Sequence, residues 1–167
     1  MRKVAMLAVL AAVAAAGCGG GGGGSGGIVN FVGDWDYSGG TITQACAGSD
    51  PEVMNLLTYQ VSTDRTGNVG EIAYQTSFDA YGCFRYLHVS GNTATMTSQV
   101  PCSDRGTDPT YGPYTLVITP QSETLTYLGG GALRESQTNA LTYTYDTDGF
   151  VLNCTSTISN ASLVLYR

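Results

Sequence analysis

The sequence predicts an all-β protein, an antiparallel meander of about eight to ten strands closed into a barrel, with a β-sandwich as the alternative. From Phe31 onward, short runs of alternating apolar and polar residues follow one another, rich in Thr, Val and Tyr. Clusters of Gly, Asn, Asp and Ser separate these runs, as turn residues do. No segment carries an apolar stripe at helical spacing, so we expect no long helix.

The first half of the domain supplies four of the expected strands. The first runs from Gly33 to Ala45 and bends at Gly39-Gly40, because glycine pairs mark bulges and bends in strands. Asp50 followed by Pro51 predicts one helical turn over 51–57, since Asp caps helices and Pro suits their first position. Three strands then follow by apolar alternation, at 57–62, around Ile72 to Tyr74, and at 84–89.

The second half continues the same pattern. Ser90-Gly91-Asn92 predicts a tight turn into a strand over 93–98. The stretch 101–113, with three prolines and two aspartates, is expected to be a loop. Further strands are expected at 114–119, 123–128, 139–145, 150–158 and 161–167.

Four cysteines follow Cys18, and an even number in an exported domain predicts two disulfides. Their spacing contains no Cys-x-x-Cys pair, which argues against a zinc site. If every connection is a simple reversal, all four cysteines lie toward one end of the sheet. Folding back about Gly91-Asn92 brings residue 83 opposite about residue 100, which favours Cys83–Cys102 and, by elimination, Cys46–Cys154. The alternation of strand direction alone does not decide which cysteines form disulfides with each other.

The N-terminus predicts export. Arg2 and Lys3 precede an unbroken apolar run from Val4 to Ala16, too short for the roughly 20 residues of a spanning helix. The run ends in Ala15-Ala16-Gly17-Cys18, which resembles the lipobox of bacterial lipoproteins, although Ala15 stands where Leu is usual. A plain secretory signal is the alternative.

The lipobox resemblance implies that residues 1–17 are a signal peptide and that Cys18 is acylated after cleavage, with palmitate-type chains holding the protein on a membrane. Residues 18–27 are nearly all glycine after Cys18, which predicts a flexible tether. Residues 28–167 would form a single β-barrel domain. By the family's sorting rule, Gly19 in place of Asp implies the outer membrane, on its periplasmic or surface face.

The charge of the chain argues against nucleic acid as a partner. After the signal there are five arginines and no lysine, against thirteen Asp and Glu residues. The arginines are scattered, whereas phosphate binding needs clustered basic residues.

Gly33-Asp34-Trp35 at the start of the domain is similar to the Gly-x-Trp signature of lipocalins and their calycin relatives. In that family the Trp plugs one end of the barrel beneath a C-terminal Arg. The resemblance implies the same barrel-end plug for Trp35 and Arg167. The overall layout also resembles that of small Gram-negative envelope lipoproteins, a likeness that implies no activity.

Residues for catalysis or metal binding are sparse. His88 is the only histidine, and no recognisable nucleophile motif accompanies it. The members of the acidic pairs Asp34/Asp36 and Asp146/Asp148 lie two residues apart in the sequence. Neither 146/148 nor 104/108 brings together enough oxygen ligands to bind Ca²⁺. We therefore expect no enzyme, no cofactor and no metal.

Tyrosines form the remaining functional signal, because six fall on the apolar phase of their strands: Tyr59, Tyr74, Tyr86, Tyr127, Tyr143 and Tyr145. They predict either ordinary core packing or a cavity whose apolar wall carries a few hydroxyls. We expect a membrane-anchored envelope lipoprotein that binds a small apolar ligand. The alternative is an adhesion or scaffolding module with a filled β-core that contacts other envelope proteins.

Overall fold

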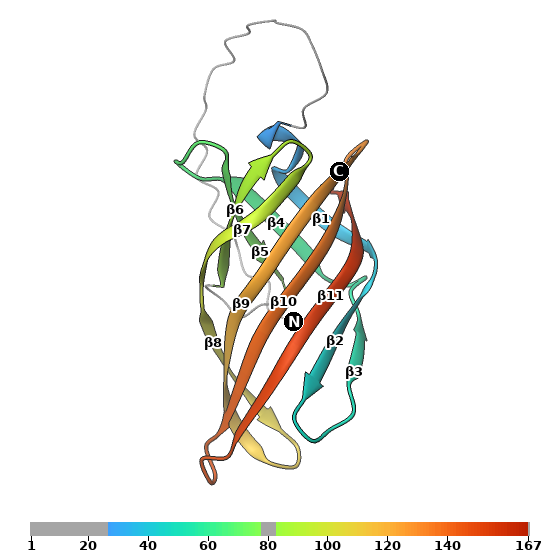
Figure 1. Cartoon of the computed structure of the whole chain (residues 1–167). Coiled ribbons are helices and arrows are strands. Elements are labelled where there is room, and N and C mark those ends of the chain that lie inside the picture. Colours follow the sequence, from blue (N-terminus) through green and yellow to red (C-terminus); the bar gives the residue numbers. More distant parts are fainter. Residues whose placement is uncertain (1–26, 78–82, 167) are drawn as a thin grey trace, which may run out of the picture.

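The computed structural model describes residues 27–77 and 83–166, which form one antiparallel sheet of eleven strands (Figure 1). A short 3-10 helix precedes the strands. The elements in chain order are η1 (Ile28–Asn30), β1 (Gly33–Gly39), β2 (Thr41–Cys46), β3 (Glu52–Asn55), β4 (Gln60–Arg65), β5 (Glu71–Thr76), β6 (Phe84–Ser90), β7 (Thr93–Val100), β8 (Cys102–Asp108), β9 (Gly112–Gly129), β10 (Ala132–Tyr145) and β11 (Val151–Leu165). In the described residues, no helix is both long and apolar enough to cross a membrane.

Eight strands close on themselves through hydrogen bonds. Their order is β1-β4-β5-β6-β7-β9-β10-β11, and β11 pairs again with β1. We call this closed set the ring. The prediction of an all-β antiparallel meander that closes like a barrel is therefore confirmed. Long strands β9, β10 and β11 extend beyond the ring, where β8 flanks one side and β2 and β3 flank the other (Figure 1).

The strand expected over 33–45 is two strands, which separate at Gly40. Both pair with β11, β1 with residues 162–165 and β2 with residues 154–158. Gly40 has φ +121°, and a Cβ there would lie 2.6 Å from the Cβ of Ala161, so this crossing requires glycine. Asn160, at φ 55°, lies between the two paired parts of β11.

The helical turn expected over 51–57 is wrong, because residues 52–55 form strand β3. Thr41 pairs with Asn55 and Gln44 with Glu52 along the edge of β2. An isolated helical turn would form few hydrogen bonds, whereas this pairing uses the free edge of β2. Pro51 also suits the residue before a short edge strand.

Three further boundaries differ from expectation. The loop expected over 101–113 contains strand β8, whose one pairing partner among the described strands is β9. The two strands expected over 114–128 are one, since Pro120 sits at a register shift that tolerates its missing N–H. The last two expected strands, 150–158 and 161–167, are likewise the single strand β11, of which residue 167 lies outside the described part.

Two groups of buried side chains fill the interior. The ring core is mainly aliphatic and aromatic, with Trp35, Ile72, Leu87, Leu125, Leu133 and Leu163 among its members. The second group, which we call the disulfide core, lies where the long strands leave the ring and consists of Cys83, Cys102, Ile118, Leu141 and Cys154, with Cys46 against it.

Disulfides join Cys46 to Cys154 and Cys83 to Cys102, the pairing favoured from the turn at Gly91. Their Cα atoms are 4.0 and 4.9 Å apart. Cys46 and Cys154 are direct cross-strand partners in β2 and β11. All four cysteines gather in the disulfide core, as the strand parity indicated, and two disulfides are consistent with an exported protein.

Candidate ligand pocket and its buried polar network

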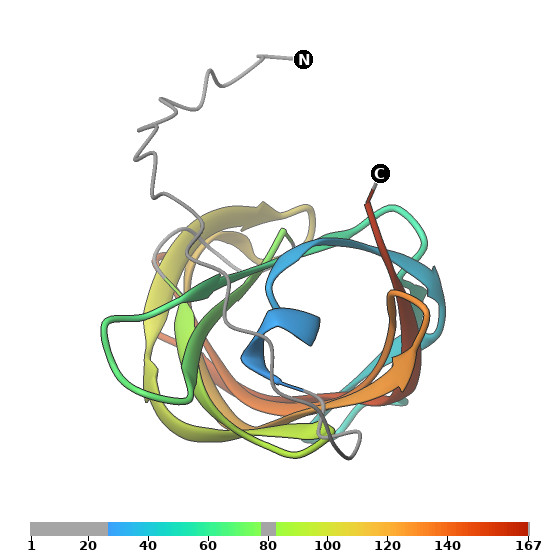
Figure 2. The ribbon, with the colours of Figure 1, turned by 90° about the horizontal axis from the view of Figure 1, so that it is seen from above.

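Trp35 lies buried near the end of the ring where β1 begins. Its side chain is 2% exposed, and its Nε1 donates a hydrogen bond of 3.0 Å to Thr63 Oγ1. The Thr63 hydroxyl in turn donates to the carbonyl oxygen of Phe31. Helix η1 lies at this end of the ring, as the view along the ring shows (Figure 2). Arg167, expected to cover Trp35, lies outside the described residues.

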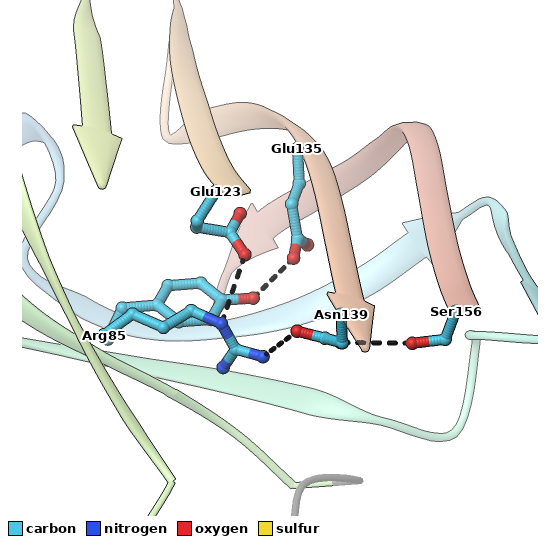
Figure 3. Close-up of polar contacts among 6 residues, drawn as sticks. Arg85, Glu123, Glu135, Asn139 and Ser156 are labelled. Atoms are coloured by element: carbon cyan, nitrogen blue, oxygen red, sulfur yellow. Dashed lines mark hydrogen bonds and ion pairs between the residues drawn. The ribbon is translucent and has the colours of Figure 1, made fainter. Parts of the chain in front are cut away.

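Charged side chains are buried inside the ring, which the sequence reasoning missed. Arg85, Glu123 and Glu135 are almost fully buried and come from β6, β9 and β10. Arg85 Nε lies 3.7 Å from Glu123 Oε2 (Figure 3). The Arg85 guanidinium also lies over the Tyr74 ring, 5.4 Å from its centroid. A buried charge is stable only when it is paired in this way.

Two tyrosines bring their hydroxyls to this charged group. Tyr74 Oη donates a hydrogen bond to Glu135 Oε1. Burial raises the pKa of Tyr74 well above its usual value, and the nearby carboxyls of Glu123 and Glu135 raise it further. Burial, followed by the charge of Glu135, likewise raises the pKa of Tyr37. Both phenols therefore stay protonated and able to donate.

From Arg85 the network continues toward the long strands. Arg85 Nη2 donates a hydrogen bond of 2.9 Å to Asn139 Oδ1. Asn139 Nδ2 donates in turn to Ser156 Oγ at 3.2 Å (Figure 3). The network thus connects strand β6 to β10 and β11 across the interior.

Gln137 lies on β10 between Glu135 and Asn139, and its side chain is 2% exposed. Within the described part of the chain, neither its Nε2 nor its Oε1 has a hydrogen-bond partner. A buried amide in this condition is uncommon in folded proteins and gives the interior unused hydrogen-bonding capacity.

A partly open pocket of about 170 Å³ lies at the end of this network. Strands β2, β3, β9, β10 and β11 and the segment before β4 supply its walls. We call it the lower pocket, and its lining residues are Ile42, Gln44, Met54, Tyr59, Leu116, Ile118, Asn139, Leu141, Tyr143 and Ser156. Most of the wall is apolar, and Asn139 with Ser156 forms a polar floor.

Of the six tyrosines expected to line a cavity, Tyr59 and Tyr143 reach the lower pocket. Burial raises the pKa of Tyr143, and its hydroxyl donates to Gln44 Oε1 at 3.3 Å. Tyr74 lies in the charged network, and Tyr127 packs beside Phe31 with ring centroids 6.2 Å apart.

The other two tyrosines lie elsewhere. Tyr145 belongs to an aromatic group near the far ends of β9 and β10, where it contacts Tyr111, Tyr114 and Phe150. Tyr86 is on the outer face of β6 together with His88, because Arg85 and Leu87 take the inward positions. The sequence placed Tyr86 on the apolar phase of its strand, whereas in β6 the buried positions belong to the alternate phase of Arg85 and Leu87.

Features that would support other chemistry are scarce. In residues 27–77 and 83–166, no cluster of three or more His, Cys, Asp or Glu side chains is arranged to hold a metal ion. Cys18 and residues 19–26 of the glycine tether lie outside the described residues. In comparisons with known proteins, no family model, curated protein or solved structure matches this chain.

Proposed function

We propose that this protein is an exported lipoprotein that binds a small, largely apolar ligand in the lower pocket and performs no catalysis. The observation that carries the proposal is the pocket itself, with apolar walls and a polar floor held by buried hydrogen bonds. Apolar surroundings with a few fixed polar groups are typical of small-molecule sites.

The volume of the pocket limits the size of the ligand. An engineered apolar cavity of roughly 150 Å³ holds one benzene molecule. The lower pocket, at about 170 Å³, suits a single substituted ring or a short branched chain. A longer molecule would have to extend out of the open side of the pocket.

A larger side chain that fills the lower pocket should prevent ligand binding. We expect Leu141→Trp to weaken the binding of acetophenone about tenfold or more, because the larger side chain occupies the ligand volume. The matched control is Val117→Trp, on the outer face between two pocket residues and 38% exposed. Isothermal titration calorimetry on the full chain measures both variants against the wild type.

The proposal fails if the wild type shows no saturable binding across small ketones, alcohols and hydrocarbons. That result would favour the alternative of an adhesion or scaffolding module, whose core needs no ligand. The ring core of buried apolar side chains is the feature that such a module would share.

The proposed anchor is the acylated thiol of Cys18, which would place the domain on the outer membrane through its glycine tether. We expect Cys18→Ser to move the protein from the membrane fraction to the soluble fraction. Ser25→Ala, within the same tether, should leave it membrane-bound. Fractionation of cells that export each variant is the measurement, and membrane retention of Cys18→Ser would contradict lipid anchoring.

A further inference from the structure

The orientation of the Asn139 amide follows from the chemistry of its neighbour. A guanidinium group carries only hydrogen-bond donors, so Arg85 Nη2, at 2.9 Å, must face the amide oxygen of Asn139. The amide nitrogen is therefore directed to Ser156, at 3.2 Å. Because that nitrogen can only donate, Ser156 Oγ acts as the acceptor in this contact.

This arrangement leaves the hydroxyl proton of Ser156 for another partner. Within the described residues, Ser156 Oγ takes part in one side-chain hydrogen bond, as acceptor from Asn139. Asn139 and Ser156 are 2% and 4% exposed, and both line the lower pocket. The floor of the pocket thus offers the Ser156 hydroxyl as a hydrogen-bond donor beneath mostly apolar walls.

Charge at the pocket restricts the ligand further. None of the lining residues is acidic or basic. The cation nearest the floor, Arg85, is already paired with Glu123, and Glu135 lies in the same network. A carboxylate ligand would bring a further negative charge to this acidic interior without a free cation to balance it.

We infer that the lower pocket selects a small uncharged ligand whose buried end carries a carbonyl-type acceptor, such as a ketone, ester or lactone oxygen, for the Ser156 hydroxyl. Arg85 and Asn139 are positioning residues, because they fix the direction of that proton without touching the ligand's acceptor. This inference rests on the proposed function and specifies its ligand class.

Two probes of similar shape test the inference in the wild type. Acetophenone carries a ketone oxygen, whereas isopropylbenzene has no hydrogen-bonding group. We expect the full chain to bind acetophenone about threefold to tenfold more tightly, the ratio one net hydrogen bond provides. In Ser156→Ala this preference should disappear, while the affinity for isopropylbenzene stays within about twofold.

Asn139→Asp tests the direction of the proton. A carboxylate accepts from both Arg85 and Ser156, so the Ser156 hydroxyl should turn toward residue 139 and present a lone pair to the pocket. We expect acetophenone to lose its advantage over isopropylbenzene. The alcohol 1-phenylethanol can donate to that lone pair and should become the tightest of the three probes. A role of Asn139 in structure alone would weaken all three probes together.

The outcomes separate the two proposals. Equal binding of acetophenone and isopropylbenzene to the wild type, with both lost in Leu141→Trp, would overturn the acceptor preference and leave the pocket's function standing. An acetophenone preference that persists in Ser156→Ala or Asn139→Asp would also overturn it. Absence of saturable binding by every probe would overturn the proposed function and this inference together.

Discussion

Arg85→Met should lower the free energy of unfolding by about 3–5 kcal/mol, a large part of the stability of an ordinary domain. The substitution keeps an unbranched side chain but removes the only described cation in a network that also contains Glu123 and Glu135. Glu123 would lose its ion-pair partner, and Asn139 Oδ1 would lose its hydrogen-bond donor. Urea unfolding at neutral pH, followed by circular dichroism, is the measurement.

The control for this variant is Arg134→Met, which removes an exposed arginine from β10 and should change stability by less than about 0.5 kcal/mol. A second comparison adds Glu123→Met to Arg85→Met. Because the pair then becomes apolar together, the double variant should be more stable than Arg85→Met alone. A loss in Arg85→Met no larger than in Arg134→Met would contradict the buried ion pair.

Removal of the Cys46–Cys154 disulfide should be the second large effect. It spans a sequence separation of 108, against 19 for Cys83–Cys102. In the chain-entropy model, closing the longer loop contributes roughly 4–5 kcal/mol and the shorter about 3 kcal/mol. We therefore expect the double alanine variant at 46 and 154 to unfold at a lower guanidinium concentration than the variant at 83 and 102.

Both double alanine variants remove one disulfide from the same core, so each serves as the control for the other. The m-value of unfolding should not fall in either variant, since both fold to the same surface as the wild type. If the variant at 83 and 102 proved the less stable of the two, loop length would not decide their difference in stability. Local packing around Cys83, which is fully buried, would then be the larger contribution.

The class of fold could be predicted from the sequence because turn chemistry and apolar alternation agree over most of the chain. Gly129-Gly130-Gly131, all at positive φ, forms the hairpin between β9 and β10 as a turn-rich break should. The edge strand β8 was missed because its residues are mostly exposed and pair on one side only. No apolar face distinguishes such a strand from a loop.

The polar residues of the candidate site could not be predicted because they take buried positions in their strands. In β10, the inward positions include Glu135, Gln137 and Asn139, so residues 132–138 show no apolar alternation although they form a buried strand. Arg85 is similar, since a charged residue on a strand is normally assigned to solvent. A usable signal was present: Arg85 shares its phase with Leu87, which is buried. Only spatial proximity shows that these polar residues satisfy one another.

The proposed function requires that a small ligand occupies the lower pocket above its polar floor. Nuclear magnetic resonance of the full chain, titrated with acetophenone, tests this directly. We expect the side-chain amide of Asn139 and the methyl groups of Ile42 and Ile118 to shift together and to saturate at one equivalent. Shifts confined to exposed residues, or no saturable shift at these three side chains, would contradict it.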